Sequence, residues 1–335
     1  MPRAEIDRLS RAVAEQLAER RAVPGRTRFV TAVNGAGFLA ALVGTRRAGL
    51  IPVLADASSP AAERARVAAA LGAAFQIECD EPFPKGPDAI RVRAEDRVAG
   101  TAPEGAGYVK LTSRLLRSTR RVAIAPEALA ADDDQLASSM GLRASDRFVA
   151  AIPWSHSYGL SSLVMPALRR GSLLVIPDDG GPWAALEAAS SLAATVFPTV
   201  PVYLQTIASL AAPPAWPTSL RTVISAGAPL HAETAARFKE TFGRDAHVFY
   251  GASRCGGIAY DREGGAALAR NGGDAGRRRG PHPRRGRCGP RPILSGRPRP
   301  RAGSVPRLGG GVFRSADLAS WTPEASCVSP GAPTR

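Results

Sequence analysis

Five short stretches of the sequence carry residue types that could bind or transform a small molecule. Four of them lie at the ends of expected strands, and the fifth follows a basic segment. Hydroxyl groups occur at Thr112 and Ser113, and an imidazole occurs at His156. Glycines such as Gly227 and Gly251 could bring backbone N–H groups close to a ligand, because glycine has no side chain. In open α/β sheets ligands bind at the carboxyl ends of strands, so these stretches could line one site. In chain order they are Thr112-Ser113, Pro153–Leu160 (PWSHSYGL), Ser225–Leu230 (SAGAPL), Tyr250–Gly257 (YGASRCGG) and Phe313–Leu318 (FRSADL).

The elements that must position these stretches alternate between apolar segments and helical patterns. Ile6, Leu9, Val13 and Leu17 predict an amphipathic helix at the start of the chain. Strands that are apolar throughout and separated by helices predict an α/β fold with largely parallel sheets. Two such runs, before about residue 100 and after about residue 140, predict two similar α/β lobes. The expected strands are 28–34, 50–56, 73–79, 147–153, 172–177, 194–200, 220–226 and 246–251, and the expected helices are 38–49, 60–73, 159–171, 183–193, 201–210 and 231–243.

The stretch 108–125 (YVKLTSRLLRSTRRVAIA) begins and ends like a strand but has an unusual middle. Strand-to-strand turns are rich in Gly, Ser and Pro. Here the segment Arg114–Arg121 holds four arginines and no glycine.

The amino-acid composition of the chain changes at about Gly264. Residues 265–306 have no apolar periodicity and are dense in Gly, Pro and Arg, so they cannot bury enough surface to fold alone. Residues 307–321 have the pattern of an ordered segment again, and 322–335 have the composition of an unstructured tail.

The net charge of +15 is concentrated in two places. Between Arg270 and Arg301 there are eleven arginines against one acidic residue, and Arg114–Arg121 holds four more arginines. A nucleic-acid function would therefore rest on local segments, and Arg277–Arg301 lacks the interleaved aromatic residues that stack on bases. Nucleic-acid binding consequently ranks low.

The four cysteines, Cys79, Cys255, Cys288 and Cys327, are not spaced as a C-x-x-C pair or as a zinc site. A reduced, cytoplasmic protein is the simplest interpretation. No apolar run reaches the roughly 18 residues that a membrane span needs.

Taken together in this order, the five stretches resemble the AMP-forming acyl-adenylate synthetases. This superfamily includes acyl-CoA synthetases, luciferases and the adenylation domains of peptide synthetases. The resemblance covers roughly Phe29 to Trp321, in patches. It implies the large N-terminal domain of such a ligase over residues 1–264, with a remnant of the ribose-binding region at 307–321. It also implies that the small C-terminal domain with the catalytic lysine is absent from this chain.

The resemblance also implies roles for individual residues. His156 would border the acyl pocket, and Asp317 would bind the ribose. Thr112 and Ser113 would be the remnant of the loop that holds the ATP phosphates. The residues implied to line or approach the adenine are Gly227, Ala228, Pro229, Tyr250, Gly251 and Ser253. The implied ligands are ATP or AMP, Mg²⁺, a carboxylic acid and coenzyme A or a carrier protein.

Two departures from the family pattern bear on activity. The glycines of the phosphate loop are replaced by Arg114–Arg121, and Arg254 stands where the family has a glutamate that contacts the metal. An arginine would repel Mg²⁺ rather than ligate it. A compensated change of reading frame is the hypothesis that explains the arginines here and in 270–306, because a GC-rich gene read out of frame yields mainly Arg, Gly, Pro and Ala. A genuine disordered basic linker is the alternative for 270–306.

The leading functional expectation is therefore an AMP-dependent acyl-CoA synthetase-like ligase whose activity is impaired. It would convert a fatty or aromatic acid and ATP to an acyl-adenylate and then to a thioester. The alternative is a non-catalytic remnant of the same fold that binds a nucleotide or an acyl group. A serine hydrolase is disfavoured, because Gly251–Cys255 (GASRC) lacks the last glycine of G-x-S-x-G.

Overall fold

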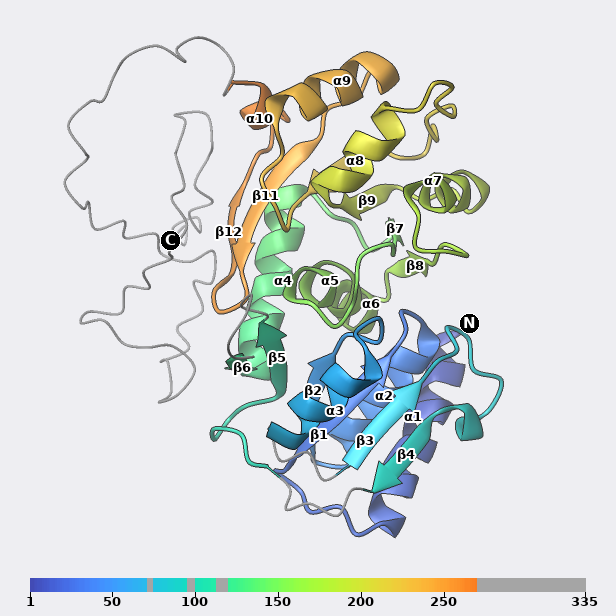
Figure 1. Cartoon of the computed structure of the whole chain (residues 1–335), viewed down its shortest axis with the longest axis vertical. Helices are drawn as coiled ribbons and strands as arrows, with labels where there is room; N and C mark the ends of the chain where they lie inside the picture. Colours follow the sequence, from blue (N-terminus) through green and yellow to red (C-terminus); the bar gives the residue numbers. More distant parts are fainter. Residues whose placement is uncertain (71–74, 95–99, 113–119, 270–335) are drawn as a thin grey trace, which may run out of the picture. The chain divides into compact units, whose positions relative to one another are not determined.

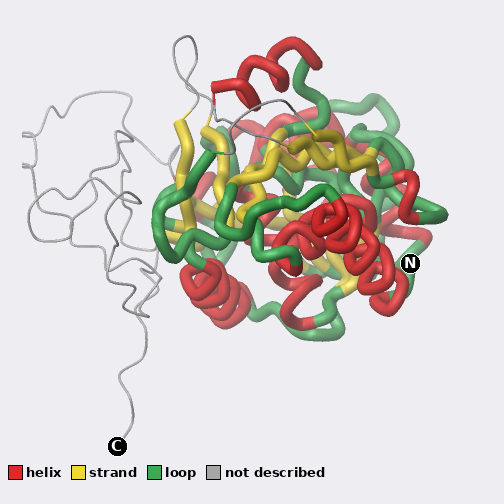
Figure 2. Tube along the Cα trace, turned by 90° about the horizontal axis from the view of Figure 1, so that it is seen from below, coloured by secondary structure: helices red, strands yellow, loops and turns green. Residues whose placement is uncertain are grey.

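The computed structural model describes residues 1–70, 75–94, 100–112 and 120–269. These residues divide into two compact units. The first comprises residues 1–129 and 153–160, and the second comprises 130–152 and the chain from Ser161 onward, within the described ranges. Figure 1 labels the elements in chain order, and Figure 2 marks helices in red and strands in yellow.

The first unit is built on a six-stranded sheet of order β4-β3-β1-β2-β5-β6. The strands β3, β1, β2 and β5 are parallel, and the two edge strands β4 and β6 are antiparallel to their neighbours. The elements are α1 (Arg3–Glu19), β1 (Thr27–Ala32), α2 (Ala36–Arg47), β2 (Ile51–Ala55), α3 (Ala61–Ala70), β3 (Phe75–Cys79), a 3₁₀ turn (Pro87–Ala89), β4 (Arg91–Ala94), β5 (Tyr108–Thr112), β6 (Arg120–Ile124) and α5 (Ser157–Gly159).

Helices cover both faces of this sheet. The register aligns Phe29, Val53 and Val109 on one face, where they pack with Ala68 of α3. Helix α2 lies against β1, β2 and β3, and α1 packs on α2. The apolar residues that predict the first helix, Leu9, Val13 and Leu17, are fully buried. Burial of such a face contributes roughly 1.5–3 kcal/mol for each large apolar side chain.

The second unit has a six-stranded sheet of order β12-β11-β10-β9-β7-β8. Five strands run parallel, and only β12 is antiparallel to its neighbour. The elements are α4 (Pro126–Met140, whose first residues belong to the first unit), β7 (Arg147–Val149), a π-helical turn (Leu160–Val164), α6 (Met165–Arg170), β8 (Leu173–Val175), α7 (Pro182–Ser191), β9 (Val196–Thr199), α8 (Pro201–Ala208), β10 (Thr222–Ser225), α9 (Ala232–Phe242), β11 (His247–Ala252), β12 (Gly256–Tyr260) and α10 (Ala266–Ala269).

One face of the second sheet carries its main apolar core. Val149, Phe197 and Val223 project from successive strands into a cluster formed with α7, α8 and α9. Phe238 of α9 is fully buried there and meets Trp216 edge-to-face, with 5.3 Å between ring centroids. Side chains of the alternate positions, Phe148 and Ile224 among them, face α4 and α6 around a small cavity. The space available to the centre of a water molecule there is about 10 Å³, which is room for about one water.

The predicted α/β class with largely parallel sheets is confirmed. The expected strand pair within 108–125 forms as β5 and β6, paired antiparallel from Tyr108 with Ile124 to Thr112 with Arg120. The elements that were not expected from the sequence include α4, β4 and β12. The short helix α10 lies inside the segment 265–306, for which no order was expected, and residues 270–335 lie outside the described residues.

Candidate functional site

The carboxyl ends of β9, β10 and β11 form one edge of the second sheet, because these strands are adjacent and parallel. Ser225 ends β10 beside Thr199, the last residue of β9. The Ala226 N–H donates to the Thr199 carbonyl at 3.1 Å, so the pairing extends one residue further. The chain then turns outward through the exposed residues 227–229. The predicted stretch Ser225–Leu230 therefore lies at a strand exit.

Gly227 begins the exposed segment with a backbone that other residues rarely adopt. Its φ is +85°, in the left-handed region that favours glycine. A Cβ added there would meet only Val200 Cγ1 at 3.6 Å, which is an ordinary contact. Glycine is therefore required at this position by its conformation and not by lack of space.

Two buried hydroxyl groups lie at the same edge. Thr199 and Ser225 are 0% and 1% exposed, and neither side-chain oxygen has a hydrogen-bond partner among the described residues. An unpaired buried polar group costs roughly 1–3 kcal/mol. These hydroxyls keep hydrogen-bonding capacity at the strand ends. Ser225 opens the stretch Ser225–Leu230 that the sequence analysis singled out, whereas no motif indicated Thr199.

The stretch Tyr250–Gly257 forms a β-hairpin rather than a simple loop. Tyr250 and Gly251 belong to β11, with a register shift between them. The turn closes where the Cys255 N–H donates to the Ala252 carbonyl at 3.0 Å, and Ser253 and Arg254 lie in it. A Cβ on Gly251 would meet the Gly256 carbonyl oxygen at 3.0 Å, so the two strands approach closely here.

Asp132 of α4 anchors this hairpin through a hydrogen bond to its backbone. Its Oδ1 accepts a hydrogen bond from the Gly257 N–H at 2.9 Å, and the carboxylate is 2% exposed. Gly256 has φ +77°, and a Cβ there would lie 2.5 Å from Asp132 Oδ1. The sequence analysis did not indicate this support.

The residues at the hairpin do not fit a metal ion. Arg254 offers hydrogen-bond donors but no lone pair for a cation. Within residues 1–70, 75–94, 100–112 and 120–269, no group of three or more His, Cys, Asp or Glu could hold a metal. The described part of the hairpin therefore offers no set of ligands for Mg²⁺.

The stretch Pro153–Leu160, which carries His156, lies in the first unit. Trp154 is buried, meets Phe38 edge-to-face at 5.7 Å, and donates its backbone N–H to Asn34 Oδ1 at 3.0 Å. A Cβ on Gly159 would lie 2.1 Å from the Pro153 carbonyl oxygen, so only glycine fits there. The stretch is thus fixed on both sides of His156.

His156 is paired with a carboxylate that the sequence analysis did not single out. Its Nε2 lies 3.3 Å from Asp56 Oδ2, while the imidazole side chain remains 58% exposed. Asp56 Oδ1 accepts hydrogen bonds from the Ser58 N–H at 2.9 Å and from its hydroxyl at 2.7 Å. The hydrogen bond from His156, together with those from Ser58, holds the pKa of Asp56 well below its usual range.

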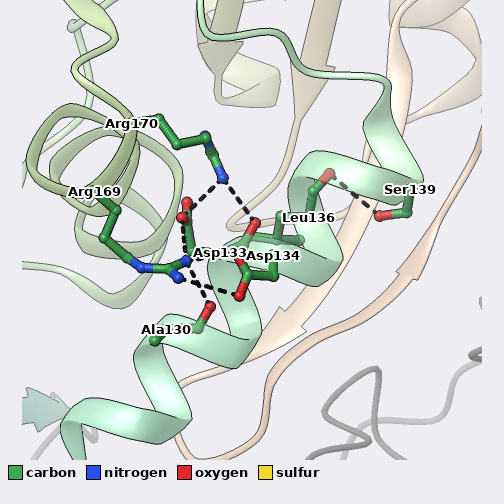
Figure 3. A network of polar contacts seen from close by, with 7 residues as sticks. All are labelled: Ala130, Asp133, Asp134, Leu136, Ser139, Arg169 and Arg170. Atoms are coloured by element: carbon green, nitrogen blue, oxygen red, sulfur yellow. Dashed lines mark hydrogen bonds and ion pairs between the residues drawn. The ribbon is translucent and has the colours of Figure 1, made fainter.

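A buried ion-pair network joins α4 to α6 in the second unit (Figure 3). Asp133 Oδ2 accepts hydrogen bonds from Arg169 Nη1 at 2.7 Å and from Arg170 Nη1 at 2.8 Å. The Asp133 side chain is fully buried, whereas Asp134, which also pairs with Arg169, is 65% exposed. Burial raises the pKa of Asp133 against the opposing effect of the two arginines.

Thr112 is the one remaining predicted site residue that lies among the described residues. Thr112 is the last residue of β5 and pairs through its backbone with Arg120. Ser113 and Asp317 lie outside the described residues, as do most of the arginine segment 114–121 and the two cysteines at 288 and 327.

The AMP-binding enzyme family model matches residues 118–290 of the sequence. The chain belongs to the AMP-binding enzyme family. The matched range includes the hairpin Tyr250–Gly257 and the strand exit at Gly227. The resemblance to adenylate-forming ligases is therefore confirmed at the level of the family.

Solved structures of 18–24% identity share the fold. The o-succinylbenzoate coenzyme A synthetase MenE from Bacillus subtilis, in complex with AMP, is 20% identical with a TM-score of 0.63, over 78% of this chain and 71% of that one. The amide bond synthetase McbA from Marinactinospora thermotolerans is 24% identical with a TM-score of 0.63, over 78% and 56%. The nonribosomal peptide synthetase FmoA3, in an AMPPNP-bound form, is 20% identical with a TM-score of 0.62, over 77% and 29%.

This chain thus spans between 29% and 71% of the length of these three proteins. No curated protein gives a significant match to the sequence. Among the described residues, no helix combines the length and the apolar character that crossing a membrane requires. A cytoplasmic location stays a prediction.

Proposed function

We propose that the chain binds an adenine nucleotide, ATP or AMP, at the carboxyl edge of the second sheet. One observation carries the proposal: the exposed segment Gly227–Pro229 lies just beyond β10, and the pair Tyr250–Gly251 lies near the carboxyl end of the adjacent parallel strand β11. Gly227, Ala228 and Pro229 would lie along the adenine, with Tyr250, Gly251 and Ser253 beside it. The small apolar side chains of this segment suit the flat face of a purine. The ribose would be held by Asp317.

The reaction we infer is the activation of a carboxylic acid. A carboxylate oxygen attacks the α-phosphorus of ATP, an O–P bond forms, and the bond from that phosphorus to the bridging oxygen breaks, which releases pyrophosphate. The thiol of coenzyme A or of a carrier protein then displaces AMP from the acyl-adenylate to give a thioester. His156 would border the pocket for the acyl group, a fatty or aromatic acid. Such a reaction depends mainly on positioning and on charge stabilisation.

We further propose that this chemistry is slow in this chain. Arg254 brings positive charge to the hairpin turn where the family has a metal-contacting glutamate, so it cannot help to hold Mg²⁺. The phosphate-loop remnant Thr112-Ser113 continues into Arg114–Arg121 without the glycines that let backbone N–H groups surround an anion. These departures favour a second candidate function, nucleotide or acyl binding without catalysis.

The experiment uses the full chain and two measurements. Isothermal titration with ATP and with AMP tests binding, and ATP–pyrophosphate exchange with a panel of fatty and aromatic acids tests catalysis. Binding with exchange supports the ligase, and binding without exchange supports the second candidate. Absence of binding to either nucleotide contradicts both.

A matched pair of glycine variants locates the site. Gly227→Val should abolish nucleotide binding, because it forces a β-branched residue to φ +85° in the proposed adenine segment. Gly141→Val forces the same kind of strain at φ +61°, at a position where a Cβ meets nothing within 4 Å. Equal loss of binding in both variants would place the effect in folding and not in the site.

A further inference from the structure

The Asp56 carboxylate has two oxygens with separate tasks. Asp56 follows β2 directly, and its Oδ1 is occupied by the Ser58 N–H and hydroxyl. The turn that carries Ser58 is fastened in turn by Arg64 of α3, which donates to the carbonyls of Ala57, at 3.0 Å, and of Ser59. Oδ2 is left to face His156 Nε2 at 3.3 Å. The carboxylate is therefore held in place before it meets the imidazole.

The backbone of His156 is held as firmly as that of Asp56. The His156 N–H donates to the Pro153 carbonyl at 3.3 Å, and its carbonyl accepts from the Leu160 N–H at 2.9 Å. Gly159 packs against Pro153 with no room for a side chain. The 3.3 Å approach thus joins two fixed segments that lie about a hundred residues apart in the sequence.

An ionised carboxylate can only accept hydrogen bonds, so the nitrogen that faces it must carry a proton. Nε2 therefore keeps its proton whether the imidazole is neutral or charged. Nδ1 has no hydrogen-bond partner among the described residues, and the side chain is 58% exposed. We propose that Asp56 is a positioning residue that fixes the His156 ring and its proton on Nε2, and so presents Nδ1 as the nitrogen that meets the ligand.

The proposal rests on the proposed function in one respect, namely that His156 borders the acyl pocket. It deepens that function, because it states which ring atom meets the acyl substrate. In the neutral imidazole Nδ1 is an acceptor, so the substrate group that it favours is an O–H or N–H donor on the acid. The alternative is that the Asp56–His156 pair only holds two loops together. That structural role would require neither a proton fixed on Nε2 nor an available Nδ1.

The test is nuclear magnetic resonance of the full-length chain labelled with ¹⁵N in its four histidines. His156→Gln assigns the His156 signals by their disappearance. In the wild type we expect Nε2 to carry a proton that exchanges slowly enough to be observed. Asp56→Ala should abolish that proton signal, whereas Asp56→Asn, which retains an acceptor oxygen, should restore it.

The matched control is Asp80→Ala, which removes a carboxylate that pairs with Arg91 instead. It should leave the His156 signals unchanged. An equal change in Asp56→Ala and Asp80→Ala, or an Nε2 proton signal that survives Asp56→Ala with the fold intact, would overturn the proposal. If Asp56→Ala does not fold, Asp56→Asn in the same spectra decides, since loss of the Nε2 proton despite an available acceptor contradicts the assigned role.

A second titration separates this proposal from the proposed function. Hydroxylated or amino-substituted aromatic acids, added with AMP, should shift the Nδ1 resonance of His156 and leave the Nε2 proton in place. A shift of Nε2 with release from Asp56 overturns the positioning role. If neither resonance moves, the acyl role of His156 fails while the Asp56-dependent Nε2 proton still supports the pair.

Discussion

The Asp132 carboxylate of helix α4 accepts a hydrogen bond from the backbone N–H of Gly257 at 2.9 Å. The two residues are 125 positions apart in the sequence. Through this contact a helix of the second unit fixes the β-hairpin that contains Tyr250 in its first strand and turns at Arg254. A helix that the sequence did not indicate therefore supports one half of the proposed nucleotide site.

We predict that Asp132→Ala destabilises the protein by about 1–3 kcal/mol, because it leaves a buried N–H unpaired. Asp132→Asn should cost less, since its amide oxygen can replace Oδ1 and since Oδ2 has no hydrogen-bond partner among the described residues. Urea unfolding of the two variants measures the difference. A larger loss in the asparagine variant would show that the charge, and not the hydrogen bond, matters.

The shared carboxylate of Asp133 should matter more than that of its exposed neighbour. Asp133→Ala removes the partner of Arg170 from a buried network, and breaking a buried pair from one side typically costs about 3–5 kcal/mol. Asp134→Ala, at a side chain that is 65% exposed, should cost less than about 1 kcal/mol. Thermal or urea unfolding of both variants checks the ratio. Equal effects would contradict the view that burial makes the network important.

The pKa of Asp56 predicts a pH dependence of stability. Because the pKa is lower in the folded chain than in the unfolded one, the stabilisation from Asp56 is fully present above a pH of about 4. It is lost as the pH falls toward the folded pKa, because the unfolded state takes up the proton first. The free energy of unfolding of the wild type should therefore fall more steeply between pH 5 and pH 3 than that of Asp56→Asn. Parallel curves for the two proteins would contradict the hydrogen bonds that we assign to Asp56.

Asp133 should behave in the opposite sense. Its pKa is raised by burial, so its contribution to stability is greatest below the unfolded pKa and declines as the pH rises through the folded value. The contribution of Asp133 to the free energy of unfolding therefore grows as the pH falls, and it partly offsets acid unfolding. Asp133→Asn, measured in the same pH series as Asp56→Asn, should lack this contribution. The slope of unfolding free energy against pH for this variant should be steeper than that of the wild type.

The sequence predicted the fold class because its buried strands are apolar along their whole length, as β1 and β2 are. It missed α4, whose interior mixes Asp132, Asp133 and Asp134 with apolar residues and so lacks a clean amphipathic pattern. It missed β12 because the strand begins with two glycines that act in a turn and a close packing contact.

The sequence likewise indicated some residues of the candidate site and missed others. Gly227 and Gly159 were indicated by motif, and backbone geometry explains both, through a positive φ in one and a 2.1 Å approach in the other. Asp56 and Asp132 were not indicated, because each acts across a long sequence separation on a residue that only the fold brings near. The roles of His156 and Tyr250 toward ligands stay predictions.

A charge reversal at the hairpin turn tests why the chain departs from its family. Arg254→Glu replaces a guanidinium, which cannot ligate a cation, with a carboxylate, which can. If Arg254 is what limits catalysis, ATP–pyrophosphate exchange should rise about tenfold or more, since a bound metal can contribute several kcal/mol to charge stabilisation. Arg262→Glu makes the same charge change at an exposed position just beyond β12 and should leave exchange unaltered. A rise in both variants would point to overall charge, and no rise in either would show that Arg254 is not what limits the exchange.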